Sequence, residues 1–128
     1  MQYESFYGAQ AEQISFYRIP KALFTEPNFR ELSTDAKVLY GILLDRMSLS
    51  LKNQWLDAQN KVYIIFTVEE IMDALNCANQ KATRLMVELE KRAWLIERKR
   101  QGLGRPNLIY VKNFAATIND KSCEKGDS

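Results

Sequence analysis

The sequence FTVEEIMDALNCANQKATRLMVELEKRAWLIERKRQGLGRPNLIYVKNF, residues 66–114, decides the fold. It opens with a capping box: Thr67 can accept a hydrogen bond from the first turn of a helix, and Glu70, three residues later, can accept one in return. The short helix that this pattern predicts has an apolar inner face made of Ile71, Met72 and Leu75. The segment Asn76–Asn79 then predicts a turn.

A second helix is predicted over about Asn79–Ala93. Its apolar residues recur at the spacing of a buried helix face, namely Ala82, Leu85, Met86 and Leu89. Two β-prone runs follow, Leu95–Arg100 and Leu108–Val111, and Gly102 and Gly104 permit a tight hairpin tip between them. The order helix, turn, helix, hairpin predicts an α+β fold, a winged helix-turn-helix whose wing is the β-hairpin.

The flanking sequence extends this unit on both sides. Ser33 or Thr34 suits the N-cap of an upstream helix, and apolar residues keep helical spacing to about Ser48. The apolar run Val62–Phe66 predicts a buried strand. We therefore expect an N-terminal extended arm and lead-in over residues 1–32, the winged-helix domain over 33–114, and a polar linker or disordered tail over 115–128.

Charge is distributed unevenly along the chain. Residues 1–78 carry 7 Lys and Arg against 10 Asp and Glu, whereas residues 79–107 carry 8 against 3, and residues 108–128 carry 3 against 3. The predicted second helix and wing therefore hold a local charge of +5 in a chain whose net charge is only +2. A clustered basic segment of this kind is typical of a surface that binds a polyanion.

The second helix supplies the candidate residues for reading DNA. Gln80, Lys81 and Arg84 lie on its outward side near its start, and these side-chain types can bind base edges in the major groove. The alternative is a charged helix face that only contacts solvent. The neighbouring capped helix and basic hairpin favour the DNA-binding interpretation. The candidate set on this helix is Asn79, Gln80, Lys81, Thr83, Arg84 and Glu88.

The wing supplies candidate residues for gripping the DNA backbone. Its basic side chains are Arg98, Lys99, Arg100 and Arg105, and Asn107 lies beside them. We expect these residues to contact phosphate oxygens next to the major groove. The alternative is a charged edge hairpin that prevents aggregation.

The composition argues against several other classes of function. Without histidine, the usual Ser/His and Cys/His catalytic pairs cannot form, so we do not expect an enzyme. Cys77 and Cys123 lack the spacing of a metal site, and no motif indicates a cofactor. An unpaired cysteine in a turn and another in a polar tail fit a reducing compartment, and no apolar run could span a bilayer. We expect a cytoplasmic protein that does not contact membranes.

The aromatic residues before the first long helix leave two interpretations open. Phe16, Tyr17, Phe24 and Phe29 could form a dimer interface, or they could close the core of their own domain. We expect a homodimer, because the Tyr17–Phe24 arm supplies apolar and β-prone surface that a small winged helix does not need internally.

Three blocks of the sequence resemble one known family. Residues Phe16–Phe24, Leu32–Tyr40 and Leu95–Lys112 are similar, in that order, to the N-terminal domain of RepA_N-type plasmid replication initiators of Gram-positive bacteria. The resemblance covers about residues 14–114, and the wing block is its most specific part. It implies a winged-helix domain that binds repeated double-stranded DNA sites at a plasmid origin and so initiates replication. It also implies a separate C-terminal domain, beyond this chain, as a contact for host replication proteins.

The resemblance has two limits. It does not extend through the second helix, so the base-reading assignment of Lys81 and Arg84 is inferred from physical chemistry. Before Leu95 the family pattern leads us to expect a glycine-containing junction, where this chain has Ala93 and Trp94. The sequence leaves two further functions open: a winged-helix transcriptional regulator, which would bind one operator, and a primosome scaffold, which would bind proteins and only weakly DNA.

Overall fold

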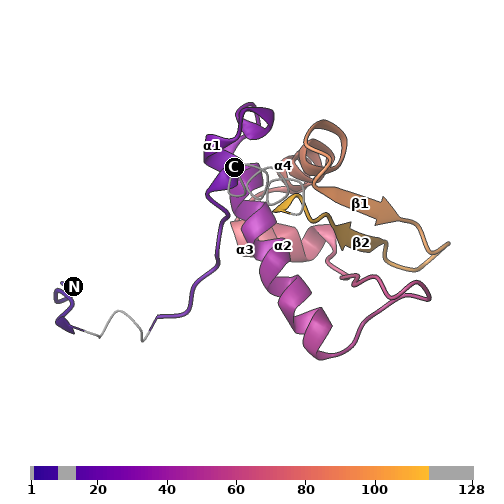
Figure 1. The fold of residues 1–128 in the computed structure, drawn as a ribbon, viewed down its shortest axis with the longest axis horizontal. Coiled ribbons are helices and arrows are strands. Elements are labelled where there is room, and N and C mark those ends of the chain that lie inside the picture. The colour runs from indigo at the N-terminus through magenta and orange to yellow at the C-terminus, as the bar shows by residue number, and fades with distance from the viewer. Residues whose placement is uncertain (1, 9–13, 116–128) are drawn as a thin grey trace, which may run out of the picture.

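The computed structural model describes residues 2–8 and 14–115 (Figure 1). Its elements in chain order are α1 (Ala22–Thr25), a 3-10 turn (Pro27–Phe29), α2 (Thr34–Lys52), α3 (Val68–Leu75), α4 (Asn79–Val87), a π-helical turn (Glu88–Arg92), β1 (Ile96–Lys99) and β2 (Leu108–Val111). The expected tail over 115–128 lies, apart from its first residue, outside the described residues. No helix in the described ranges is long and apolar enough to cross a membrane.

Helix α2 forms the centre of the packed body. The Ser33 hydroxyl accepts a hydrogen bond from the backbone N–H of Ala36, which confirms the predicted N-cap. The face of α2 that includes Leu39 and Leu43 is fully buried. The helix runs past the expected end near Ser48 to Lys52, and Ser50 in this last part is still buried.

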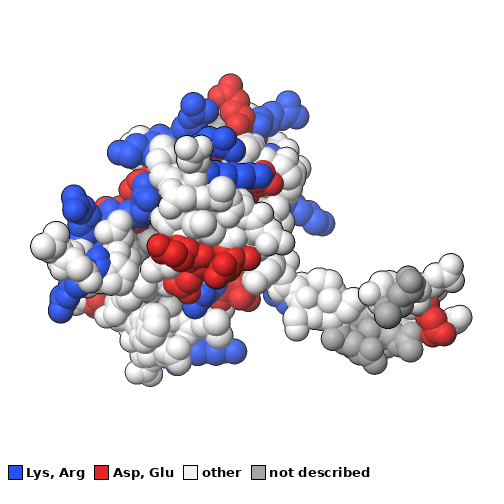
Figure 2. Space-filling view, turned by 180° about the vertical axis from the view of Figure 1, so that it is seen from behind, with Lys and Arg blue, Asp and Glu red and all other residues white. Residues whose placement is uncertain are grey.

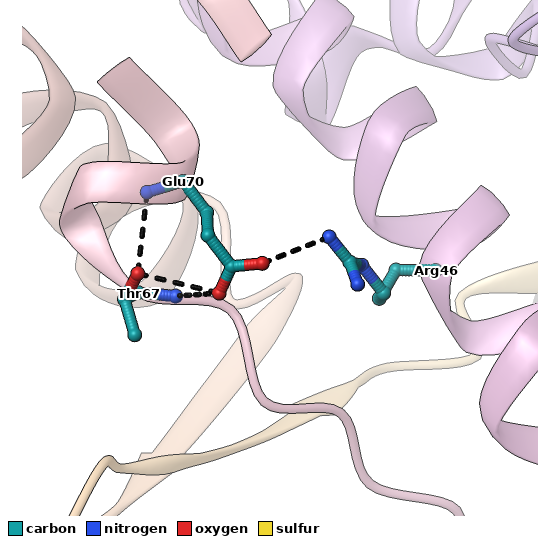
Figure 3. A network of polar contacts seen from close by, with 3 residues as sticks. All are labelled: Arg46, Thr67 and Glu70. Carbon is teal, nitrogen blue, oxygen red and sulfur yellow. Dashed lines mark hydrogen bonds and ion pairs between the residues drawn. The ribbon is translucent and has the colours of Figure 1, made fainter. Parts of the chain in front are cut away.

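Helix α3 begins with the capping box that its sequence predicted (Figure 3). The Glu70 backbone N–H donates to the Thr67 hydroxyl at 3.2 Å, and the Thr67 backbone N–H donates to the Glu70 carboxylate at 3.1 Å. The other carboxylate oxygen of Glu70 binds the Arg46 guanidinium of α2 at 3.0 Å. Arg46 also lies 4.7 Å from the ring centre of Phe66, so one side chain holds α3 and the preceding segment against α2.

The wing is the predicted antiparallel hairpin. Strands β1 and β2 pair with Arg98 opposite Ile109. The expected strand Val62–Phe66 is reduced to two isolated bridges, and in one of them Ile64 and Ile109 exchange two backbone hydrogen bonds of 2.9 Å. Its neighbours do not continue that pairing, because Val62 instead forms a bridge with Leu56 in the preceding loop.

The second helix of the helix-turn-helix is shorter than its apolar pattern predicted. Asn76 ends α3 in the left-handed conformation, with φ of 55°, and α4 begins at Asn79. Regular α-helix ends at Val87, and the expected continuation to Ala93 is a π-helical turn. The wider turn keeps Leu89 buried while Glu88 and Glu90 reach partners on α2 and the wing.

The packed body begins earlier than the expected boundary at residue 33. Leu23 of α1 is buried, and Phe29 packs edge-on against Phe114 with ring centres 5.4 Å apart. The backbone just before α1 passes so close to α2 that a Cβ on Gly41 would lie 2.9 Å from the Arg18 carbonyl oxygen. Tyr17, the residue before this approach, lines a cleft with Ile42 and Arg46 of α2. The arm that projects from the body in Figure 1 is therefore formed by earlier residues.

Trp94 occupies the junction where the family pattern leads one to expect glycine. Its φ of 57° lies in the left-handed region, which costs a residue with a Cβ roughly 1–2 kcal/mol. The side chain is 76% exposed, so burial of the indole offsets little of that cost. The chain keeps the backbone geometry of a glycine junction without a glycine.

We expect Trp94→Gly to be more stable than Trp94→Ala by about 1 kcal/mol, since both remove the indole and only glycine removes the strain. Urea denaturation of the two variants measures the difference. At an ordinary helix or strand position alanine is the more stable of the two. An alanine variant that equals or exceeds the glycine variant would show that the junction is unstrained.

Candidate nucleic-acid interface

Some of the residues predicted to contact DNA bases lie on the exposed face of α4. Asn79, Gln80, Thr83 and Arg84 are exposed, and the Thr83 hydroxyl donates a 3.4 Å hydrogen bond to the Asn79 side chain. Within the described chain, the side chains of Gln80 and Arg84 have no hydrogen bond or ion pair. Their polar groups are therefore available to an external partner.

Two other predicted residues of this helix already have partners on α2. Lys81 forms an ion pair with Asp35 at 2.7 Å; both side chains are about half exposed, so solvent weakens the pair. The Glu88 carboxylate accepts hydrogen bonds from the backbone N–H and the hydroxyl of Ser33. Lys81 can exchange Asp35 for a DNA contact at small cost, whereas Glu88 stabilises the start of α2.

The predicted wing residue Arg98 faces the body of the protein. Its guanidinium donates two hydrogen bonds to the Glu90 carboxylate, at 2.7 and 3.0 Å, and its backbone N–H donates a third at 3.2 Å. Both side chains are mostly buried. Burial alone would raise the pKa of Glu90, but the hydrogen bonds and charge of Arg98 outweigh it and hold that pKa below its usual value.

The tip of the wing exposes the remaining predicted residues, Lys99, Arg100, Arg105 and Asn107. Gly102 and Gly104 have φ of 124° and 79°, conformations that a residue with a Cβ rarely adopts. The Gln101 side chain closes the tip by donating a 2.8 Å hydrogen bond to the Pro106 carbonyl. Arg100 and Arg105 thus lie on the short connection between the strands, and Lys99 is the last residue of β1.

The positive charge of residues 79–107 is more exposed than the net charge indicates. Of the eight Lys and Arg residues, Lys81 and Arg98 form ion pairs, which leaves six. These six are exposed, and their side chains have no ion pair or hydrogen bond to another described residue: Arg84, Lys91, Arg92, Lys99, Arg100 and Arg105. In Figure 2 basic side chains gather along the top and the wing side, and acidic side chains gather in the centre of that face.

Sequence reasoning missed Glu90 as a residue of this region. Its position in a run of alternating charges, Glu88 to Arg92, resembles an ordinary solvated helix. The bond to Arg98 depends on the π-helical turn and on the return of the chain into β1. Local sequence carries no signal for either feature.

The described elements define a winged helix-turn-helix domain with a basic second helix and wing. The profile of the family described as "Replication initiator protein A (RepA) N-terminus" matches residues 15–125, and the chain belongs to this family. The resemblance seen in the sequence is thereby confirmed.

Individual relatives agree with this assignment. A protein of Lactobacillus helveticus, described as "41 kDa protein", is 30% identical over 103 residues, which are 80% of this chain and 28% of that protein. The chain thus spans less than a third of that relative. A solved structure described as "Structure of Rep-DNA complex" is 34% identical with a TM-score of 0.72, and the match covers 98% of both chains. Another, described as "Structure of MDR initiator", is 39% identical with a TM-score of 0.70 over 98% of this chain and 99% of that chain.

We expect Glu90→Gln to lower the free energy of unfolding at neutral pH by about 1–3 kcal/mol, because a carboxylate that binds a mostly buried arginine is lost. The folded pKa of Glu90 lies below its unfolded value of 4.5. The ion pair therefore contributes fully above that value, and its contribution disappears as the pH falls through the folded pKa. Urea denaturation across acidic and neutral pH measures both effects.

Glu97→Gln is the matched control, since the Glu97 carboxylate pairs with Lys112 on the exposed side of the hairpin. Exposed pairs contribute little to stability. Equal losses in the two variants would contradict a special role for the Glu90 contact.

Proposed function

We propose that this chain is the DNA-binding domain of a plasmid replication initiator and binds repeated duplex sites at the plasmid origin. The observation that carries the proposal is the set of six exposed cations without internal partners on α4, its following turn and the wing. Membership of the replication-initiator family supports the replication origin as the DNA that the domain binds. The activity is binding, without a catalytic step in this domain.

The proposed geometry assigns different tasks to the helix and the wing. The start of α4 enters the major groove, where Arg84 can donate two hydrogen bonds to guanine and Gln80 can bind adenine. Among the described residues no side chain caps this end of α4, so its first backbone N–H groups can bind a phosphate. Arg100 and Arg105 on the wing bind phosphates beside the groove, which adds affinity without choosing a sequence.

Footprinting on the cognate plasmid is the direct test. Protection that recurs over several similar sites in the origin is the expected result. A single protected operator beside a promoter would favour a transcriptional regulator, and weak protection without sequence preference would favour a protein scaffold. Either outcome would overturn the origin-binding proposal.

Variants of the helix and the wing should affect binding in different ways. We expect Arg84→Ala to weaken binding to the cognate duplex by about 1–3 kcal/mol and to affect a scrambled duplex much less. The double variant Arg100→Ala/Arg105→Ala should weaken binding to both duplexes by similar factors. Fluorescence anisotropy titrations with both duplexes measure these affinities.

Salt titrations separate the two kinds of contact. If the domain neutralises about 4–6 phosphates, log K falls against log salt with a slope of roughly −4 to −5. The wing double variant should flatten this slope by about one unit for each lost phosphate contact. Lys52→Ala, at the far end of α2, is the matched control and should change neither quantity. A flat slope for the wild type would contradict phosphate binding.

We also propose that the domain forms a homodimer through its N-terminal arm. Phe16 and Tyr17, where the arm meets the body, are 65% and 58% exposed, which leaves apolar surface to be covered. The body has an open groove of about 950 Å³, lined by side chains that include Leu44, Met47 and Phe114. The arm of a second copy has the apolar character needed to occupy it.

Sedimentation equilibrium of the wild type and of Phe16→Ser/Tyr17→Ser tests the dimer. We expect a dimer at micromolar concentration for the wild type and a monomer for the variant, because serine removes the apolar contact while the exposed positions leave the core intact. Val87→Ser, which alters an exposed apolar residue of α4, is the control. A monomeric wild type, with or without DNA, would overturn the arm-mediated dimer.

Contacts of the whole initiator extend beyond this domain. The chain corresponds to 28% of the Lactobacillus helveticus relative. We propose that the remaining part of such a protein contacts host replication proteins, and that the site of action is the cytoplasm, where plasmid DNA is replicated.

A further inference from the structure

The contact between Glu90 and Arg98 joins the two elements that face DNA in the proposed function. Glu90 lies in the π-helical turn that follows α4, and Arg98 lies in the first strand of the wing. Three hydrogen bonds of 2.7, 3.0 and 3.2 Å link them, and one involves the strand backbone. A contact that includes the backbone holds the strand itself and not only a flexible side chain.

The other contacts of the wing hold its base. The Tyr110 hydroxyl on β2 donates a 3.0 Å hydrogen bond to the Asp57 carboxylate, and the Tyr40 hydroxyl donates one of 3.0 Å to the Lys112 carbonyl just after β2. Ile64 holds β2 at Ile109, and Arg98 lies opposite Ile109 in the register of the hairpin. Beyond this level an open cleft of about 260 Å³, lined by Thr67, Arg105 and Pro106 among others, separates the wing tip from the start of α3. The position of the tip therefore depends on how the base of the hairpin is held. A two-stranded ribbon has little rigidity of its own.

We propose that Glu90 is a positioning residue for DNA recognition, which sets the placement of the wing relative to α4 by holding Arg98. Arg98 acts through this contact and not by binding phosphate. The inference rests on the proposed function for its consequence, because both elements must meet the same duplex at a fixed spacing. It also changes the role expected for Arg98 from the sequence alone.

Because Glu90 is negatively charged, the direction in which Glu90→Gln changes DNA affinity tests the inference. Glu90→Gln removes a negative charge from a DNA-facing region, and electrostatics alone then strengthens binding to every duplex. A positioning role has the opposite consequence, since a wing that is no longer held meets the cognate duplex less often in the correct geometry. Weaker cognate binding after removal of an acid has no simple electrostatic explanation.

The test compares three variants on cognate and scrambled duplexes. We expect Glu90→Gln to weaken cognate binding by roughly 3- to 30-fold, the range seen when a coupling residue outside the ligand contact is changed. Arg98→Lys, which keeps the charge and loses the paired hydrogen bonds, should weaken it in the same direction. Glu97→Gln makes the same charge change one residue before Arg98, and should leave cognate binding unchanged or stronger.

Amide hydrogen exchange of the free protein supplies a readout that needs no DNA. The wing amides of Lys99 and Leu108 should exchange faster in Glu90→Gln and Arg98→Lys than in Glu97→Gln, while the amides of α2 remain protected. Measurements well below the unfolding temperature, with folding verified by circular dichroism, exclude a general loss of structure. If Glu90→Gln is unfolded, the DNA affinity and the amide exchange of Arg98→Lys test the positioning role instead.

Two results would overturn the positioning role. One is cognate affinity that is equal to or stronger than the wild type in Glu90→Gln and unchanged in Arg98→Lys. The other is wing exchange that does not differ among the variants. A wild-type protein that binds no origin duplex would instead contradict the proposed function, and the exchange measurements would still decide whether Glu90 holds the wing.

Discussion

The two backbone hydrogen bonds between Ile64 and Ile109 connect the wing to the segment that leads into the helix-turn-helix. Both side chains are almost fully buried, and the segment after Ile64 leads directly into α3. The bridge adds a third backbone segment to a hairpin of two short strands, which by itself would be marginally stable in water. Ile109 is packed in the apolar core and lies on the strand that follows the basic wing tip. Packing of this residue therefore helps to determine where the basic side chains lie.

The acidic residues among the basic ones stabilise the fold rather than neutralise the exposed cations. Glu88 binds the start of α2, Glu90 binds Arg98, and Glu97 binds Lys112 on the neighbouring strand. Glu88 and Glu90 also accept hydrogen bonds from backbone N–H groups, whereas the Glu97 pair joins two exposed side chains. The cations that remain are exposed and face solvent, so the potential of this surface is more positive than the local net charge of the segment indicates.

Helix α4 has two parts with different physical roles. Its first turns expose Gln80 and Arg84 and contain no buried polar group that needs an internal partner. Its continuation as a π-helical turn makes hydrogen bonds to α2 and to the wing through Glu88 and Glu90. The outward part can therefore adapt to a ligand while the turn behind it remains fixed, as a binding site on a rigid element requires.

The sequence by itself determined the features that depend on neighbours along the chain. The capping box of Thr67 and Glu70, the glycines of the wing tip and the helical spacing of apolar residues are local signals, and the structure confirms each. Tertiary structure alone decided which charged residues stay exposed, because Ser33 and Glu88 are 55 positions apart and meet only after α2 and α4 pack. It also reduced the expected strand to isolated bridges at Val62 and Ile64, and it turned Arg98 toward the body of the protein. Local sequence propensity cannot predict these contacts. The interactions that stabilise them involve residues that are far apart in the sequence and meet only in the folded protein.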